Sequence, residues 1–431
     1  MDHKISHLLT LQAVRERAHL VLQLAEQNLL NHYDYHPDRL DATVDYVISI
    51  IQRDFGPDKY HEIPPHGRWQ HFEVGNVPRI TNLLEKWDKL GHNSEEKVRS
   101  LVDLFFVSVL LDAGAGDYWK FTEPGTGNVY TRSEGIAVAS YYMFLNGDFA
   151  GDGTEVQDVV NGEALQKISV ETLYRGFQID DKTNPLVGAA ARVEILQRLG
   201  QSLLDNPEIF GTTGRPGALV DYLTGKGSDS LDYLDLWTAL QTLLIPIWPS
   251  DRTKIKGIPI GDAWPLSVLS KHSSISSEQA ETAPIQPFHK LTQWLAYSLK
   301  VPFSRLLNKA WTNDTLGTGL PEYRNGGLFI DMGVLSLKPA ALEKGLRISG
   351  GELPCFGAGD DEIVEWRAMT VALLDLLHER ILESGKFGDA RLSLPQVLEA
   401  GSWKAGRELA AERRPGTKSS PVLNSGDGTL F

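Results

Sequence analysis

The stretch from residue 8 to residue 30, LLTLQAVRERAHLVLQLAEQNLL, decides the fold class of this chain. Its apolar side chains recur every three or four positions, the period of an amphipathic helix: Leu8, Leu11, Val14, Ala18, Val21, Leu22, Ala25 and Leu29. The same period recurs at residues 40–55, 98–111, 137–145, 187–204, 234–244, 288–307, 364–382 and 395–411. Because strand-like alternation is rare, the sequence predicts a mainly α fold, a compact domain of many helices.

Short strands and a loop interrupt this pattern. Residues 119–132, WKFTEPGTGNVYTR, predict a hairpin because aromatic and β-branched residues flank a Pro-Gly-Thr-Gly turn. A second hairpin is expected over 327–335. Residues 270–287, rich in Ser, Glu, Ala and Pro, are either a mobile surface loop or a boundary between lobes, and we favour the loop. We therefore expect one helical domain over 1–431, although roughly 150 residues per domain would allow two or three.

Composition limits the partners and the compartment. Lys and Arg number 42 against 56 Asp and Glu, so the net charge of −14 repels nucleic acid and anionic lipid. The most apolar run, 101–111, is shorter than the ~20 residues of a membrane span, and the N-terminus lacks a secretion-signal pattern. One cysteine, Cys355, suits a reducing compartment. We expect a cytoplasmic protein that binds neither nucleic acid nor membrane, with its oligomeric state open.

Motifs for cofactors and metals are incomplete. The segments DAGAGD (112–117) and TGKGS (224–228) lack the full glycine spacing of dinucleotide-binding and phosphate-binding loops. His61, His66 and His71 could fold onto one metal ion, but solvated loop histidines are the favoured interpretation. We therefore expect no cofactor and no metal.

The segment 317–333, GTGLPEYRNGGLFIDMG, is the densest in polar residues and glycines. It combines two carboxylates, a fixed cation, an amide and an aromatic ring: Glu322, Asp331, Arg324, Asn325 and Tyr323. Its glycines allow sharp turns or a close approach of the backbone to a ligand. The alternative is a structural loop whose arginine pairs with a neighbouring carboxylate, and spacing alone does not decide between them.

Three more segments, DAGAGDYW, GDAW and VLEAGSW, place a tryptophan beside an acid. The residues concerned are Asp112, Asp117 and Trp119, then Asp262 and Trp264, then Glu399 and Trp403. An aromatic wall with a carboxylate suits a planar or sugar ligand, whereas a core tryptophan beside a capping acid is the alternative. In the helical stretch 288–299, Gln293 is a lone neutral amide that could bind a urea or uracil-like edge, or a backbone carbonyl.

The order of these segments resembles a known family. DAGAGDYW, SEGIAVASYYMF, NPLVGAAARVEILQRLG, GDAW, PFHKLTQWLAYSL, LPEYRNGGLFIDMGVL and LEAGSWKAGRE are similar to the uracil-catabolism protein family of fungi and bacteria. That resemblance implies cleavage of the N-glycosidic bond of a ribosylurea-type intermediate. Residues 184–204 also resemble the queuosine-salvage nucleoside glycosidases, which implies a helical fold similar to that of DNA glycosylases and places Gln293 and Trp294 in the base pocket.

The implied reaction sets requirements for the site. Splitting a ribosyl C–N bond needs an acid for the leaving urea and an anion for the sugar cation or the attacking water. We expect Glu322 and Asp331 to supply them, with Asp112 and Glu399 in reserve, and the order of proton transfers stays open. The expected substrate-binding residues are Gln293, Trp294, Tyr323, Arg324, Asn325, Trp119, Asp262, Trp264 and Trp403.

Folding should then bring the segments around Asp112, Asp262, Gln293, Glu322 and Glu399 into one cleft. The expected substrate is a small ribosylated urea or pyrimidine-derived molecule, with or without a 5′-phosphate. Two alternatives are a metal-dependent ureide or amide hydrolase of the same pathway and a ligand-binding scaffold without catalysis.

Overall fold

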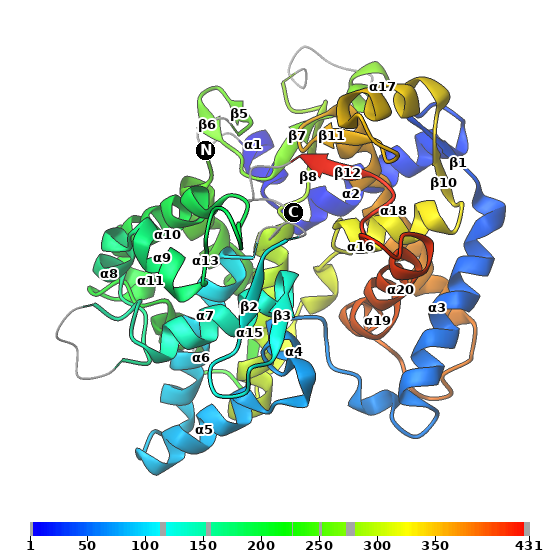
Figure 1. The fold of residues 1–431 in the computed structure, drawn as a ribbon. Coiled ribbons are helices and arrows are strands. Elements are labelled where there is room, and N and C mark those ends of the chain that lie inside the picture. The colour runs from blue at the N-terminus through cyan, green and yellow to red at the C-terminus, as the bar shows by residue number, and fades with distance from the viewer. Residues whose placement is uncertain are drawn as a thin grey trace. The chain divides into compact units, whose positions relative to one another are not determined.

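The computed structural model describes residues 3–112, 118–151, 157–225, 227–249, 252–272 and 281–425. Helices dominate these ranges, and every strand within them is two or three residues long and pairs with one other strand (Figure 1). The predicted mainly α fold is confirmed. Within the same ranges, no helix is both long enough and apolar enough to cross a bilayer.

The chain forms two compact units, each built from separated segments. The first unit contains the described residues of 1–66, 251–290 and 315–426, and the second contains those of 67–250 and 291–314. The expectation of one domain over residues 1–431 stays a prediction.

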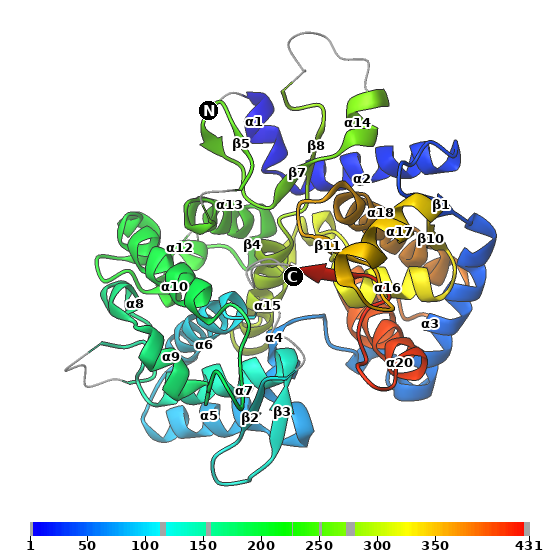
Figure 2. The same cartoon turned by 45° about the horizontal axis from the view of Figure 1, so that its top comes forward.

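Helix α18 is the centre of the first unit, because its residues 362–374 are all buried and it packs against α2, α3 and α16. Helices α16 and α20 of this unit lie side by side (Figure 2). The helices are α1 (His3–Leu8), α2 (Leu11–Glu26), α3 (Leu40–Phe55), α14 (Ser267–His272), α16 (Tyr323–Asp331), α17 (Pro339–Ser349), α18 (Asp361–Glu383), α19 (Leu394–Val397), a π-helix (Leu398–Ser402) and α20 (Trp403–Arg413). The paired strands are β1 (Tyr33–Tyr35) with β10 (Leu335–Leu337), β5 (Lys254–Ile255) with β6 (Ile258–Pro259), β7 (Ala263–Pro265) with β8 (Ile285–Pro287), and β11 (Cys355–Gly357) with β12 (Leu423–Ser425).

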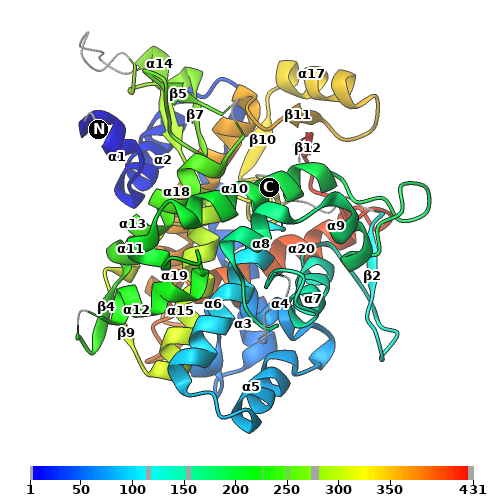
Figure 3. The ribbon, with the colours of Figure 1, turned by 90° about the vertical axis from the view of Figure 1, so that its left-hand side faces the viewer.

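Helix α6 is the centre of the second unit, because its residues 100–110 are all buried and it packs against α4, α7, α10 and α12. Helices α8 and α9 lie along α10 (Figure 3). The helices are α4 (Arg68–Phe72), α5 (Arg79–Lys89), α6 (Ser94–Leu110), α7 (Arg132–Leu145), α8 (Gly162–Lys167), α9 (Val170–Gly176), α10 (Ala189–Leu204), α11 (Pro207–Phe210), α12 (Leu219–Thr224), α13 (Tyr233–Leu244) and α15 (Lys290–Leu307). The strand pairs are β2 (Lys120–Thr122) with β3 (Val129–Thr131) and β4 (Ser230–Asp232) with β9 (Ala310–Thr312).

Most predicted elements are present, although the helix predicted at the N-terminus is divided and the helix predicted over 395–411 contains a π-helical turn. Residues 40–55 form α3 as expected, and the hairpin predicted within 119–132 is the antiparallel pair β2–β3. The helix predicted over 8–30 is divided, because Thr10 is the N-cap of α2 and its side chain accepts the backbone N–H of Ala13 at 3.1 Å. Of the loop predicted over 270–287, residues 270–272 belong to α14 and residues 285–287 form β8, while residues 273–280 lie outside the described residues.

The hairpin predicted over 327–335 is wrong, and the loop interpretation of 317–333 holds for residues 317–322 but not for the helical residues that follow. Residues 323–331 form α16, and β10 pairs with the distant strand β1. The glycines serve close packing rather than a turn: a Cβ on Gly326 would lie 2.7 Å from the indole of Trp366. That indole donates a hydrogen bond to the Gly326 carbonyl at 3.1 Å, so the absence of a side chain lets the two helices meet.

Candidate functional site

Glu322 is the N-cap of α16, and it lies almost entirely out of solvent. Its carboxylate accepts the backbone N–H groups of Arg324, at 2.7 Å, and of Asn325. Burial raises the pKa of Glu322, against the opposing effects of these hydrogen bonds and of the nearby cation Lys290. Glu322 is therefore a carboxyl group that holds its proton to a higher pH than an ordinary glutamate.

Arg15 of α2 holds the segment that leads to Glu322. Its guanidinium donates to the backbone carbonyls of Leu316, at 3.3 Å, and Gly317, at 2.7 Å, and it pairs with Asp375 of α18 at 2.9 Å. Three separate contacts therefore hold the approach to the helix start. Arg15 carried no local sequence signal, because these partners lie 301 to 360 positions away in the chain.

Asp331 is at the opposite end of α16 and is already paired. Its two carboxylate oxygens accept hydrogen bonds from Arg414 at 2.9 and 2.5 Å, and Arg414 also donates to the Ser419 carbonyl at 2.7 Å. Nine residues of helix, at ~1.5 Å each, separate Asp331 from Glu322 by about 14 Å. Carboxylate pairs that flank one glycosidic bond are typically about 5–9.5 Å apart, so this backbone separation disfavours Asp331 as the partner of Glu322. A catalytic role for Asp331 stays a prediction.

The polar residues that follow Glu322 bond to the protein itself. Arg324 donates to the Lys418 carbonyl at 2.9 Å, and its guanidinium lies 4.8 Å from the ring centre of Tyr323. The amide nitrogen of Asn325 donates to a backbone carbonyl at 3.0 Å, and its oxygen accepts the Ser402 hydroxyl at 2.8 Å. These contacts join the start of α16 to the π-helix. That Tyr323, Arg324 and Asn325 hold the sugar stays a prediction.

Glu399 is on the π-helix and is paired with a histidine. The Oε2 atom of Glu399 lies 2.6 Å from Nδ1 of His66, and the side chains are 16% and 5% exposed. The Trp403 ring packs near the imidazole, with 6.1 Å between ring centres. Single turns of π-helix inside α-helices are frequent at functional sites. His66 is therefore added to the candidate site. The sequence had indicated it only as one of three histidines that could bind a metal ion.

Asp262 and Trp264 form a closed structural cluster. The Asp262 carboxylate accepts two hydrogen bonds from Arg367, at 2.8 and 2.7 Å, one from the Trp264 indole at 2.8 Å and one from the backbone of Lys290 at 3.0 Å. Burial alone would raise the pKa of Asp262, but Arg367 and the other donors hold it well below its usual range. Four donors on one carboxylate favour the capping interpretation of this segment, and ligand contact here stays a prediction.

In the second unit, Asp112 is bound by a buried arginine. Arg68 donates to Asp112 at 2.5 Å and to the Ser108 hydroxyl at 2.8 Å, and the Ser133 hydroxyl reaches Asp112 at 3.1 Å. The Arg68 guanidinium lies 5.3 Å from the Trp294 ring centre. Sequence reasoning missed Arg68, because an isolated arginine in the stretch HGRW gives no sign that it will be buried.

Two other predicted residues of the second unit are fully enclosed. Trp119 is buried against Phe177, and its indole donates to the Phe177 carbonyl at 3.0 Å, which favours the core interpretation. Gln293 is buried within α15. Asp117 lies outside the described residues.

The predicted residues are divided between the two units. Within the first, the Asn325–Ser402 hydrogen bond brings the segments of Glu322 and Glu399 together. Asp262, Trp264 and Trp403 belong to that unit too, whereas Asp112, Trp119, Gln293 and Trp294 belong to the second. The convergence of all five segments on one cleft stays a prediction.

The three histidines noted in the sequence have separate surroundings. His61 is largely exposed, His66 binds Glu399, and Nδ1 of His71 lies 3.3 Å from the Gly67 carbonyl. Among the described residues, no three His, Cys, Asp or Glu side chains are arranged to hold a metal ion. The favoured interpretation of a solvated histidine suits His61 alone.

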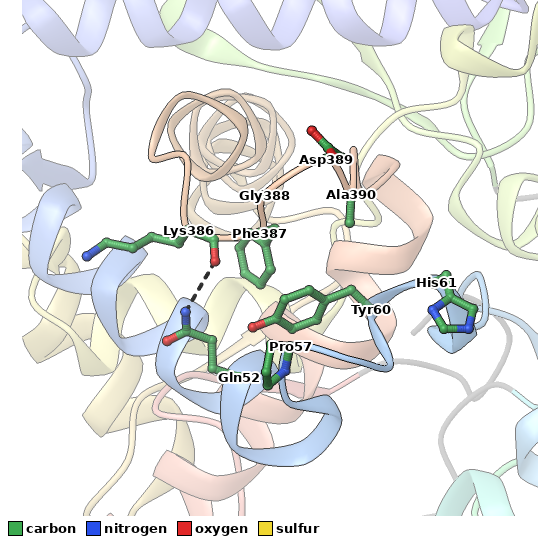
Figure 4. Close-up of a pocket in the computed structure, with 9 residues that line it drawn as sticks. All are labelled: Gln52, Pro57, Tyr60, His61, Lys386, Phe387, Gly388, Asp389 and Ala390. Atoms are coloured by element: carbon green, nitrogen blue, oxygen red, sulfur yellow. Dashed lines mark hydrogen bonds between the residues drawn. The ribbon is translucent and has the colours of Figure 1, made fainter.

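The first unit also has a shallow hollow of about 610 Å³ (Figure 4). The rings of Tyr60 and Phe387, 4.9 Å apart between centres, form part of its wall, and the Gln52 amide donates to the Lys386 carbonyl at 3.4 Å. Its lining residues are Gln52, Pro57, Tyr60, His61, Lys386, Phe387, Gly388, Asp389 and Ala390. None of the predicted catalytic or substrate-binding residues lines this hollow.

Comparison with known proteins identifies the family. The family described as "Protein of unknown function (DUF1688)" matches residues 7–431. The chain is 45% identical over 446 residues to "Uracil catabolism protein 4" of Lachancea kluyveri, covering 100% of both chains. It is 48% identical over 433 residues to "Protein urg3" of Schizosaccharomyces pombe, covering 99% of both. The chain therefore belongs to this family, and the predicted membership of the uracil-catabolism protein family is confirmed.

Proposed function

We propose that this member of the family acts in uracil catabolism by hydrolysing the N-glycosidic bond of a ribosylurea-type intermediate. The products would be urea and ribose, or ribose phosphate. The name of the Lachancea kluyveri relative supports the pathway. One observation supports the reaction itself. Glu322 and Glu399 are two poorly exposed carboxyl groups with different hydrogen-bond partners, and the Asn325–Ser402 hydrogen bond joins the segments that carry them.

In this proposal Glu322 is the general acid. Cleavage leaves negative charge on a urea nitrogen, which is a poor leaving group until it is protonated. A carboxyl group whose pKa is raised by burial retains the proton that this step needs. The carboxylate of Glu322 is also held in place by two backbone N–H groups, so its direction is set before substrate binds.

Glu399 replaces Asp331 as the second acid of the site. Asp331 is bound by Arg414 through both oxygens and is about 14 Å from Glu322 along α16, whereas Glu399 is on a neighbouring element. A carboxylate paired with a histidine can act on the attacking water through that imidazole, and its negative charge can stabilise the positive charge that develops on the sugar. Asp112 is the reserve candidate of the second unit.

Urea release by the purified full chain tests the proposal. Ribosylurea and its 5′-phosphate are supplied separately, and free urea is measured with the wild type, Glu322→Gln and the control Glu343→Gln. Glu343 is an exposed carboxylate of α17 in the same unit, 79% exposed, so its loss should leave turnover unchanged. No urea from either substrate would refute the proposal. Turnover that is lost on chelation and restored by zinc would favour the metal-dependent hydrolase, and tight binding without turnover would favour the scaffold.

A further inference from the structure

The contact between His66 and Glu399 is short, enclosed and joins distant parts of the chain. The two atoms are 2.6 Å apart, although the residues are 333 positions apart in the sequence. A short contact between an imidazole nitrogen and a carboxylate is typical of a charge-assisted hydrogen bond, which is about twice as strong as a neutral one. Solvent screens it little, since His66 is 5% exposed.

The histidine side of this contact is held by backbone bonds. The backbone N–H of His66 donates to the Pro395 carbonyl at 2.8 Å, and the Gln396 side chain donates to the Ile63 carbonyl at 2.8 Å. Both partners lie in α19, the helix that leads directly into the π-helix with Glu399. The segment that carries His66 is therefore fixed to the element that carries its partner.

The glutamate side is held from two directions. A Cβ on Gly401 would lie 2.7 Å from a methyl carbon of Val47 in α3, so the π-helix packs closely there. The hydroxyl of Ser402 donates to Asn325, three residues from Glu322. A π-turn held between α3 and α16 gives Glu399 a fixed direction toward His66.

We infer that His66 is the catalytic base that accepts a proton from the attacking water, and that Glu399 is its positioning residue. The inference rests on the proposed function and deepens it. A carboxylate on Nδ1 selects the tautomer in which Nε2 accepts a proton, and it stabilises the imidazolium that forms.

The step balances without any further reactant. The water oxygen bonds to C1′ of the ribose while the C1′–N bond breaks, and the bonding pair goes to the urea nitrogen. One water proton passes to Nε2 of His66, and Glu322 gives its proton to the nitrogen. Transfer of the proton from His66 back to Glu322 through solvent restores the starting state, and the sum is ribosylurea plus water giving ribose plus urea.

Variants of His66 distinguish a base from a structural partner. His66→Asn keeps a donor near the position of Nδ1 but has no Nε2, so kcat for urea release should fall by about two to four orders of magnitude with little change in KM. His66→Ala leaves a space, and added imidazole should restore part of its kcat. The control His61→Asn, in the same segment but with its side chain 76% exposed, should leave kcat unchanged.

Glu399→Gln completes the test. It should lower kcat without rescue by imidazole, because the base is present but poorly oriented, and Glu322→Gln should likewise not be rescued. A folded His66→Asn variant with wild-type kcat would overturn the inference. So would retained activity in His66→Asn together with complete loss in Glu399→Gln, which would make Glu399 the direct base. Absence of urea from the wild type would instead refute the proposed function, and the role of His66 with it.

Discussion

Replacing Asp331 by Asn should destabilise the protein without slowing the chemistry. The side chains of Asp331 and Arg414 are 5% and 14% exposed and share two hydrogen bonds, of 2.9 and 2.5 Å. Asparagine keeps one acceptor, but its NH₂ group then faces a guanidinium that also donates. The variant thus leaves a mostly buried cation with half of its pairing.

The magnitude follows from this geometry. Removing one partner of a buried ion pair costs about 3–5 kcal/mol, and the partial exposure of Arg414 reduces this to about 2–4 kcal/mol. For a unit of about 200 residues, at about 2–4 °C per kcal/mol, the melting temperature should fall by roughly 5–15 °C. Asp331→Leu combined with Arg414→Met removes both charges and should recover most of that loss.

Calorimetry and urea release on the same preparations check this. The kcat per folded molecule should equal that of the wild type at a temperature where the variant is folded. A melting temperature unchanged from the wild type together with a hundredfold lower kcat would refute the reasoning, because Asp331 would then act on the substrate.

Three other variants test the remaining contacts. In the proposed mechanism the acid form of Glu322 is the active one, and burial raises its pKa, so the wild-type rate should fall as pH rises through that pKa. Glu322→Gln should lower kcat by about two to four orders of magnitude and abolish that fall, and an unchanged pH profile would contradict this. Gly406→Ala should destabilise the α16–α20 contact by about 1–3 kcal/mol, because the new Cβ would overlap the Arg324 carbonyl, and a wild-type melting curve would contradict it. Burial would lower the pKa of His32, but its hydrogen bond to Asp361 and the charges of Glu365 and Glu362 raise it above 6.5. The stability that His32 adds is therefore fully present below pH 6.5 and is lost as pH rises through the folded-state pKa. The difference in melting temperature between wild type and His32→Gln should shrink from pH 6 to pH 9. A constant difference would show that the charge of His32 does not contribute to stability.

Local periodicity was sufficient to determine most helices of this protein. Residues 40–55 are helical as predicted, because the helical period depends on neighbours within one or two turns of the helix. The turn chemistry of 119–132 likewise determined the β2–β3 hairpin. The resemblance to the uracil-catabolism protein family depended on the residue order alone, and the comparisons confirm that resemblance.

Tertiary structure decided which acids are available for chemistry. Gly326 and Gly327 indicated a loop, yet both lie in α16. Trp366 packs where a side chain on Gly326 would be, and Pro421 packs where one on Gly327 would be. Asp331 and Glu399 are both acidic residues that the sequence does not distinguish. In the structure Arg414, 83 positions away, binds Asp331, whereas His66, 333 positions away, binds Glu399. Charge, burial and hydrogen-bond direction at a carboxylate are set by its neighbours in space, and no spacing rule within a single segment specifies partners so distant in the chain.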